Sequence, residues 1–210
     1  MEITSITQLN LNSTYTHLDY ISWKFRERVE LLLGKVFLMS PAASTTHQHC
    51  SSILAREFGN FFKGSTCRVF QAPFDVFFLG ENGAPDTIFQ PDLVVVCDAQ
   101  KLKERGCFGA PDLVVEILSP SSAARDVRDK YFIYEAYGVK EYWIVQPLAK
   151  TVTIHTLTSA GKFQPLKTCT LGDRIHSPLF PGLEVDLDEA FENVVSEPDI
   201  VYNENAVRMD

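Results

Sequence analysis

Three acidic residues stand in stretches of the chain that are otherwise apolar. Asp92 precedes the apolar run 93–96, Asp112 precedes the run 113–118, and Glu116 interrupts that second run. A carboxylate in such a run costs free energy unless a partner compensates its charge. Side chains alternate between the faces of a strand, so Asp112 and Glu116 share one face. If the strand after Asp92 pairs with this one, the three acids converge at one edge of a sheet and could bind a hard cation such as Mg²⁺.

A second interpretation stays open for the two aspartates. Each of them follows a proline and could simply cap a turn where a strand begins. This interpretation does not account for Glu116, which lies in the middle of its strand. The most suitable basic partner is Lys130 on the following helix, with Asp126 at i−4 and Tyr134 at i+4. The helix face that carries Lys130 points either to solvent or back to the sheet, depending on the phase of the helix.

Other kinds of chemistry have no support in the sequence. His47 and His49 are followed by no His or Cys at the spacing of a zinc site. Ser119 lacks the G-x-S-x-G context of a nucleophile, so the segment 119–122 is interpreted as a strand exit and helix N-cap. Neither a G-x-G-x-x-G nor a G-x-x-x-x-G-K-[ST] phosphate loop occurs.

The elements that must position these residues follow from the hydrophobic pattern and its Gly, Pro and Asn breaks. We expect one domain of α/β (α+β) class over residues 1–210, with a core at about 18–192 and a tail at 193–210. Its core order is helix, three strands, helix, strand. The predicted helices are 18–33, 44–62 and 124–137, the last ended by Gly138; the predicted strands are 35–39, 68–78, 91–97, 112–118, 141–145 and 151–157, followed by a hairpin turn at 161–163 and a strand-like return at 179–185.

The net charge and the hydropathy of the chain argue against two classes of function, a strongly basic nucleic-acid binder and a membrane protein. The chain has 19 Lys and Arg against 27 Asp and Glu, a net charge of -8. No global basic field therefore attracts nucleic acid, and contacts with phosphate must come from a local patch or a metal. The apolar runs are far shorter than the roughly 20 residues of a membrane span. Residues 1–20 lack a secretory signal pattern, so we expect a cytoplasmic protein without a membrane partner.

The five cysteines form an odd set without a C-x-x-C pair. This pattern fits neither a disulfide framework nor a zinc knuckle. We therefore expect reduced and mostly buried cysteines. They are Cys50, Cys67, Cys97, Cys107 and Cys169.

An ordered set of motifs resembles one known family, the Uma-type family of restriction-endonuclease-like proteins, long filed as a domain of unknown function. The resemblance covers most of the chain, from about residue 30 to residue 191. Its motifs are Leu32-Leu33-Gly34-Lys35, Met39-Ser40-Pro41 with His47, Pro73-Phe74-Asp75-Val76, the segments 90–96 and 109–121, Asp126 with Lys130, and the segments 137–145 and 179–183.

The family resembles the PD-(D/E)-x-K nucleases, and this implies a restriction-endonuclease-like core: a central mixed β-sheet flanked by helices, with additional strands. The resemblance implies that Asp92 and Glu116 bind Mg²⁺, with Mn²⁺ as a substitute and Asp112 as a further ligand. Leu118 occupies the place of the usual lysine, and Lys130 matches the amine that the family is thought to carry on the following helix. Asp75 and His47 are candidates for contacts to the ligands or to the substrate.

Two functions from different classes remain. One is a Mg²⁺-dependent endonuclease that hydrolyses phosphodiester bonds of DNA and forms a homodimer, because two active sites suit the two strands of a duplex. The other is a non-catalytic binding or regulatory module with the nuclease fold, which the acidic net charge and the departure at Leu118 favour. The geometry of the acids and of Lys130 discriminates between them.

Overall fold

The computed structural model describes residues 2–39, 44–80, 83–119, 123–192 and 194, with the backbone alone for 123–127. Its α-helices are α1 (His17–Ser22), α2 (Thr45–Phe61), α3 (Ala123–Tyr137) and α4 (Leu187–Ala190). Its strands are β1 (Val29–Leu32), β2 (Lys35–Leu38), β3 (Arg68–Gln71), β4 (Val76–Leu79), β5 (Pro85–Phe89), β6 (Leu93–Val96), β7 (Leu102–Lys103), β8 (Gly106–Phe108), β9 (Leu113–Ile117), β10 (Glu141–Gln146), β11 (Thr151–Leu157), β12 (Phe163–Thr170), β13 (Arg174–His176) and β14 (Glu184–Asp186).

The central sheet has the strand order β12-β11-β10-β9-β6-β3. Strands β3, β6 and β9 are antiparallel neighbours, whereas β9 and β10 are parallel and are connected through α3. The sequence of α2, three strands, α3 and a fourth strand is the order predicted from the hydrophobic pattern. The predicted mixed α+β class is therefore confirmed.

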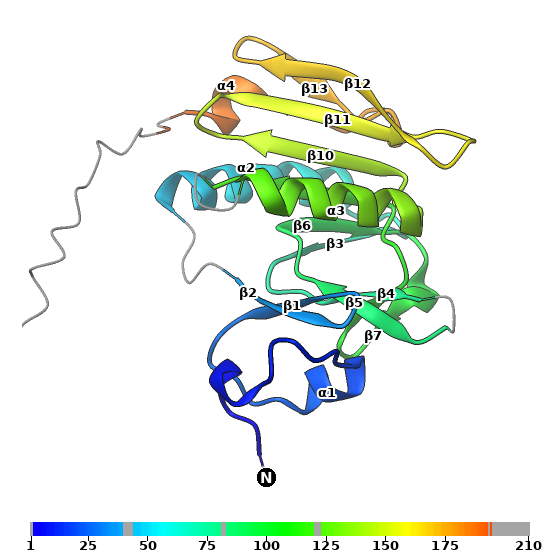
Figure 1. The fold of residues 1–210 in the computed structure, drawn as a ribbon. Helices are drawn as coiled ribbons and strands as arrows, with labels where there is room; N and C mark the ends of the chain where they lie inside the picture. Colours follow the sequence, from blue (N-terminus) through cyan, green and yellow to red (C-terminus); the bar gives the residue numbers. More distant parts are fainter. Residues whose placement is uncertain (1, 40–43, 81–82, 120–122, 193, 195–210) are drawn as a thin grey trace, which may run out of the picture.

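A second sheet has the order β2-β1-β5-β4-β8-β7 and lies below the central sheet in the view of Figure 1. One of its faces packs on the N-terminal segment through a cluster that includes Trp23, Leu31 and Phe77. Its other face contributes Phe78 and Phe89 to a cluster shared with α3 and the central sheet. Helix α3 is thus packed between the two sheets.

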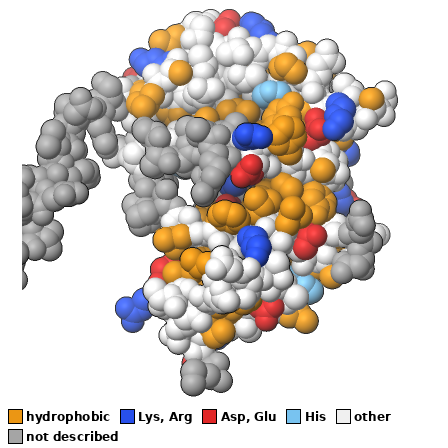
Figure 2. All heavy atoms as spheres, viewed as in Figure 1, with side chains coloured by type: hydrophobic (Ala, Val, Ile, Leu, Met, Phe, Trp, Pro, Cys, Tyr) orange, Lys and Arg blue, Asp and Glu red, His pale blue; other side chains and the backbone are white. Residues whose placement is uncertain are grey.

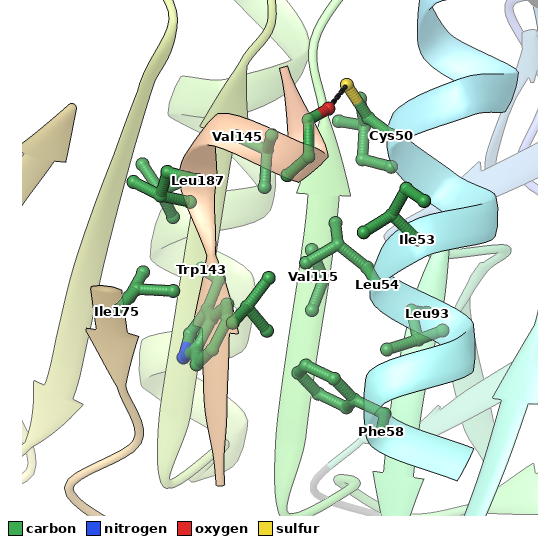
Figure 3. Close-up of a cluster of buried hydrophobic side chains, with 14 of the residues drawn as sticks. Cys50, Ile53, Leu54, Phe58, Leu93, Val115, Trp143, Val145, Ile175 and Leu187 are labelled. Carbon is green, nitrogen blue, oxygen red and sulfur yellow. Dashed lines mark hydrogen bonds between the residues drawn. The ribbon is translucent and has the colours of Figure 1, made fainter. Parts of the chain in front are cut away.

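Helix α2 covers the opposite face of the central sheet. Ser44 caps it by accepting a hydrogen bond from the His47 amide at 3.2 Å, and the buried residues Ile53, Leu54 and Phe58 follow at helical spacing. These side chains pack on Leu93, Val115 and Trp143 of the sheet (Figure 3). Strands β6 and β9 in the interior of this sheet are therefore packed from both faces.

Two predicted elements are different in the structure. The predicted helix at 18–33 is wrong beyond α1, because Val29 and Leu31 fill the second-sheet core and β1 pairs with β2 and β5. The predicted strand at 68–78 is two strands, β3 and β4, which belong to different sheets. The predicted tail at 193–210 lies outside the described residues except for Val194.

The expectation that all cysteines are reduced is wrong for Cys67 and Cys97, which form a disulfide. Strand β3 pairs with β6 so that Arg68 lies opposite Val96, and the same register places Cys67 opposite Cys97. The two residues are 30 positions apart in sequence, so no short motif reveals the pair. The expectation of buried free thiols holds for Cys50, Cys107 and Cys169.

Replacing both Cys67 and Cys97 by serine should lower the free energy of unfolding by about 2–4 kcal/mol, because the cross-link restricts the unfolded chain. Urea denaturation of the oxidised wild type and of the double variant measures this difference. Dithiothreitol should destabilise the wild type and leave the double variant unchanged. Equal stability of the two oxidised proteins would contradict a structural role for the disulfide.

In the ranges that the structure describes, no helix combines the length and apolarity needed to cross a bilayer.

Candidate active site

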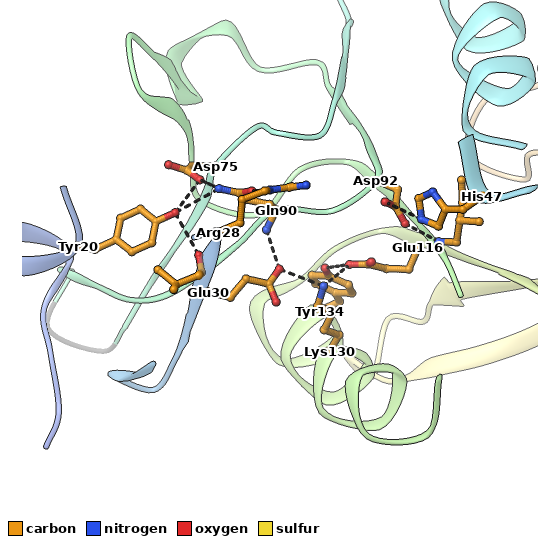
Figure 4. Close-up of polar contacts among 12 residues, drawn as sticks. Tyr20, Arg28, Glu30, His47, Asp75, Gln90, Asp92, Glu116, Lys130 and Tyr134 are labelled. Atoms are coloured by element: carbon orange, nitrogen blue, oxygen red, sulfur yellow. Dashed lines mark hydrogen bonds and ion pairs between the residues drawn. The ribbon is translucent and has the colours of Figure 1, made fainter. Parts of the chain in front are cut away.

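The pairing of β6 with β9 brings Asp92 and Glu116 together. Leu93 lies opposite Val115, so continuing the antiparallel register by one residue places Asp92 opposite Glu116. Directly opposed residues of such a pair have Cβ atoms about 5 Å apart. The Asp92 Oδ2 atom accepts a hydrogen bond from the Ile117 amide at 2.7 Å, which fixes this carboxylate beside the end of β9. The predicted convergence of these two acids is therefore seen in their geometry (Figure 4).

His47, in the first turn of α2, contacts the same carboxylate. Its Nε2 atom lies 3.2 Å from Asp92 Oδ1. Burial lowers the pKa of His47, but the hydrogen bond and the negative charge of Asp92 outweigh burial and leave this pKa raised. The structure thus places His47 where it supports Asp92 from the α2 side.

Lys130 points from α3 toward the sheets rather than to solvent. Its Nζ atom lies 3.1 Å from Glu116 Oε1 and 3.1 Å from Glu30 Oε1, and 5.3 Å from the centre of the Phe89 ring. Burial lowers the pKa of Lys130, but the two carboxylates outweigh burial and raise it above its ordinary value. Lys130 is therefore a protonated donor in contact with Glu30 and Glu116, which together with the neighbouring carboxylate of Asp92 we call the acid cluster. The side chain of Asp126, expected one turn earlier, lies outside the described residues.

Glu116 is the most strongly perturbed carboxylate of the cluster. Its pKa is raised to about 7, because burial and the charges of Asp92 and Glu30 together outweigh the lowering by Lys130. The Tyr134 hydroxyl donates a hydrogen bond to Glu116 Oε1, and burial together with Glu116 holds the pKa of Tyr134 well above 10. Glu116 therefore accepts hydrogen bonds from two residues of α3 that are one helical turn apart.

Glu30 is a member of this cluster that the sequence analysis missed. Besides Lys130, its Oε1 atom accepts a hydrogen bond from the Gln90 amide at 2.9 Å. The signal was an acid between Val29 and Leu31, but the segment was predicted as a helix, in which Glu30 has no required partner. Tyr134 was noticed only as an aromatic residue of α3.

Asp112 does not join the other acids, and this prediction is corrected. It lies four residues before Glu116, which corresponds to roughly 13 Å along a strand. Its Oδ2 atom accepts from the Cys97 amide at 2.8 Å, and its Oδ1 atom lies 2.7 Å from Lys140 Nζ. Lying on the same strand face as Glu116 therefore does not bring Asp112 into contact with the other acids. Asp112 instead fixes the opposite end of β9, beside the disulfide.

Asp75 does not contact the acid cluster directly. Its Oδ1 atom accepts hydrogen bonds from Gln90 Nε2 at 2.8 Å and from the Tyr20 hydroxyl at 3.0 Å. Burial raises the pKa of Asp75. Gln90 and Tyr20 connect Asp75 to the neighbourhood of the site.

The carboxylates of Asp92 and Glu116 are oxygen ligands of the kind that a magnesium ion prefers. Within the described residues, no cluster of three or more His, Cys, Asp or Glu side chains is arranged around a common metal position. Mg²⁺ often needs only one or two protein carboxylates, because waters and substrate phosphates complete its octahedron. Asp92 and Glu116 supply such a pair of carboxylates, with Lys130 beside it.

The fold is restriction-endonuclease-like. The sequence model of the Uma2 family, described as "putative restriction endonuclease", matches residues 18–188. This match covers most of the chain, so the chain belongs to the Uma2 family. Membership supports a nuclease function in general.

Two further proteins are similar to this chain. A solved structure from Anabaena variabilis, described as a putative nuclease belonging to DUF820, superposes with a TM-score of 0.66 at 19% identity, over 86% of this chain and 99% of that chain. At this identity the likeness shows the fold alone. The uncharacterized protein slr1290 of Synechocystis sp. is 29% identical over 118 residues, or 55% of this chain and 60% of the relative. The chain thus matches less than two thirds of that relative's length.

Replacing Lys130 by methionine should lower the free energy of unfolding by about 3 kcal/mol, because Glu30 and Glu116 would lose their buried cation. Urea denaturation at pH 8 measures the loss. A matched control is Lys162→Met, which removes a 75% exposed lysine 2.7 Å from Glu135 of α3 and should cost no more than about 1 kcal/mol. In the Lys130→Met background, Glu30→Gln should restore part of the stability. Equal losses in the two lysine variants would contradict the buried ion cluster.

Proposed function

We propose that this protein is a Mg²⁺-dependent endonuclease that hydrolyses phosphodiester bonds of DNA. The observation that carries the proposal is that Asp92, directly before β6, lies opposite Glu116 of the antiparallel strand β9. Lys130 Nζ lies 3.1 Å from Glu116 Oε1. Membership of the Uma2 family supports it. An acid pair with an adjacent amine is the arrangement expected of the enzyme and not required of a module that only binds.

Asp92 and Glu116 would hold the metal through their carboxylates. When bound, Mg²⁺ lowers the pKa of a water molecule and neutralises negative charge on the phosphate. The chain itself contributes the orientation of the two ligands. The Ile117 amide and His47 fix Asp92, and Tyr134 and Lys130 fix Glu116.

Lys130 would act as a fixed positive charge and hydrogen-bond donor. Its raised pKa keeps the amine protonated, so Lys130 is poorly suited to remove a proton from water. A protonated amine beside the metal ligands can orient the attacking water or stabilise charge that develops on a phosphate oxygen. Leu118 cannot supply this donor, and we assign the role to Lys130.

One observation favours a second candidate, a non-catalytic module that uses the same fold to bind a partner. Lys130 already contacts both Glu30 and Glu116, so the cluster is partly neutralised without a metal. A purely structural ion cluster would have the same contacts. Metal binding and cleavage therefore distinguish the two functions, and a homodimer with two active sites remains a prediction for the enzyme alone.

Mg²⁺ or Mn²⁺ should raise the melting temperature by roughly 5 °C at saturation, because the folded chain offers a site that the unfolded chain lacks. Glu116→Gln should abolish most of this increase. Glu135→Gln, which removes another carboxylate of α3 at a site paired with Lys162, should leave it unchanged. Thermal unfolding with and without each metal measures the effect, and an equal increase in all three proteins would indicate nonspecific binding.

With Mg²⁺ or Mn²⁺, the purified protein should cleave at least one member of a panel of supercoiled plasmid, linear duplex, single-stranded DNA and RNA, and EDTA should stop cleavage. Lys130→Met should cleave at least about a hundredfold more slowly at a temperature at which circular dichroism shows it folded. Lys162→Met should cleave within a few-fold of wild type. Comparable rates for the two variants would remove Lys130 from the mechanism, and no metal-dependent cleavage of any member would favour the binding module.

A further inference from the structure

Arg28 is an exposed cation held next to the acid cluster. It lies two residues before Glu30 and directly before β1, and its carbonyl accepts a hydrogen bond from the Met39 amide at 3.0 Å, which continues the pairing with β2. Alternation along this extended segment places the side chains of Arg28 and Glu30 on one face. Two residues along a strand correspond to about 7 Å. Figure 4 shows Arg28 and Gln90 beside Glu30, on the side of the cluster away from His47. Arg28 is therefore close to the proposed site without contacting the two proposed metal ligands.

The guanidinium of Arg28 is held in one orientation by Gln90. Its Nε and Nη2 atoms donate hydrogen bonds to Gln90 Oε1 at 3.0 and 2.7 Å. Gln90 Nε2 in turn donates to Asp75 Oδ1 at 2.8 Å and to the Tyr20 hydroxyl at 3.3 Å. Because the amide nitrogen of Gln90 has these two acceptors, its oxygen must face Arg28. A half-buried hydrogen-bond network thus presets an arginine at the surface.

The remaining donors of Arg28 are available to a ligand. A guanidinium has five N–H donors in a planar fork that matches the oxygens of a phosphate. Among the described residues, no hydrogen bond uses the Nη1 atom of Arg28, and no carboxylate lies within ion-pair distance of this guanidinium. Arg56 and Arg174, by contrast, are each paired with two carboxylates.

The net negative charge of the chain does not favour binding of a polyanion. The net charge is -8, and the Lys and Arg side chains on the face in Figure 2 are scattered among acidic and hydrophobic ones rather than gathered in one basic area. Attraction of a nucleic acid must then depend on individual basic residues close to the site.

We propose that Arg28, oriented by Gln90, binds a phosphate of the DNA backbone next to the phosphate that is cut. This inference rests on the proposed function, because it takes DNA as the substrate. Arg28 lies on the far side of Glu30 from Asp92 and His47 (Figure 4), so its guanidinium is placed to meet a phosphate beside the one that is cut rather than that phosphate itself. Contacts of this kind fix the register of the backbone and carry no base specificity. Gln90, Asp75 and Tyr20 are positioning residues that act through Arg28.

Binding of a fluorescein-labelled DNA duplex of about 20 base pairs, followed by anisotropy with Ca²⁺ in place of Mg²⁺, tests the proposal. Arg28→Met should weaken binding roughly tenfold or more at low salt and reduce the slope of log K against log salt by about 0.9, as expected for one lost phosphate contact. Arg28→Lys should keep the slope and lose part of the affinity, since it keeps the charge without the fork. Gln90→Met should weaken binding less than Arg28→Met. Arg174→Met, which removes an arginine of β13 paired with Glu184 and Asp186, should bind as the wild type does.

Steady-state cleavage separates this inference from the proposed function. Arg28→Met should raise KM and leave kcat within a few-fold of wild type, because a contact to a neighbouring phosphate exists before and during the reaction. Cleavage by the wild type with an unchanged KM and salt slope in Arg28→Met would overturn the role of Arg28 alone. DNA binding that depends on Arg28, without any metal-dependent cleavage, would overturn the nuclease function and support the phosphate contact. A wild-type protein that binds no duplex would overturn the phosphate contact.

Discussion

The buried contact of Lys130 with Glu30 and Glu116 is the interaction on which the rest of the structure depends. Each charge comes from a different layer: Lys130 from α3, Glu30 from the second sheet and Glu116 from the central sheet. Removing Lys130 leaves two carboxylates at the junction without their cation, which costs more than the ion pairs themselves contribute. The cluster therefore favours the one arrangement in which both sheets and α3 meet. The aromatic residues around it, Phe89 and Tyr134, exclude water and strengthen the attraction.

The two sheets have different relations to this cluster. The central sheet contains the pair Asp92 and Glu116, and the antiparallel register of β6 and β9 is sufficient to oppose them. The second sheet contributes Glu30, whose contacts with Lys130 and the Gln90 amide connect β1 to both α3 and the end of β5. The second sheet is thus more than a support for the nuclease core. Its strand β1 determines where the amine of α3 lies and, through Arg28, what charge the surface beside it has.

The sequence predicted the parts of the site that depend on neighbouring strands and missed those that depend on distant ones. Asp92 and Glu116 were found because a carboxylate in an apolar strand needs a partner, and α3 with Lys130 follows directly. Glu30 was missed because the spacing of apolar residues around it also fits a helix, and only pairing with β2 and β5 decides for a strand. The Cys67–Cys97 pair depends on the register of two strands separated by 30 residues in sequence. Asp112 was included wrongly because alternation gives the face of a strand but not the distance along it.

The charges of the cluster also bear on the proposed metal site. Glu30, Asp92 and Glu116 face Lys130 and His47, and the raised pKa values of Glu116, Lys130 and His47 all reduce the excess of negative charge in the folded chain. A divalent cation held by Asp92 and Glu116, as proposed, would supply positive charge to these carboxylates in addition to that of Lys130 and His47. Glu30 would then keep the amine in place, because its contact with Lys130 does not involve either proposed ligand. In the proposed enzyme, Lys130 of α3 would be held by Glu30 of β1. It would thus replace the usual strand lysine, whose position is occupied by Leu118.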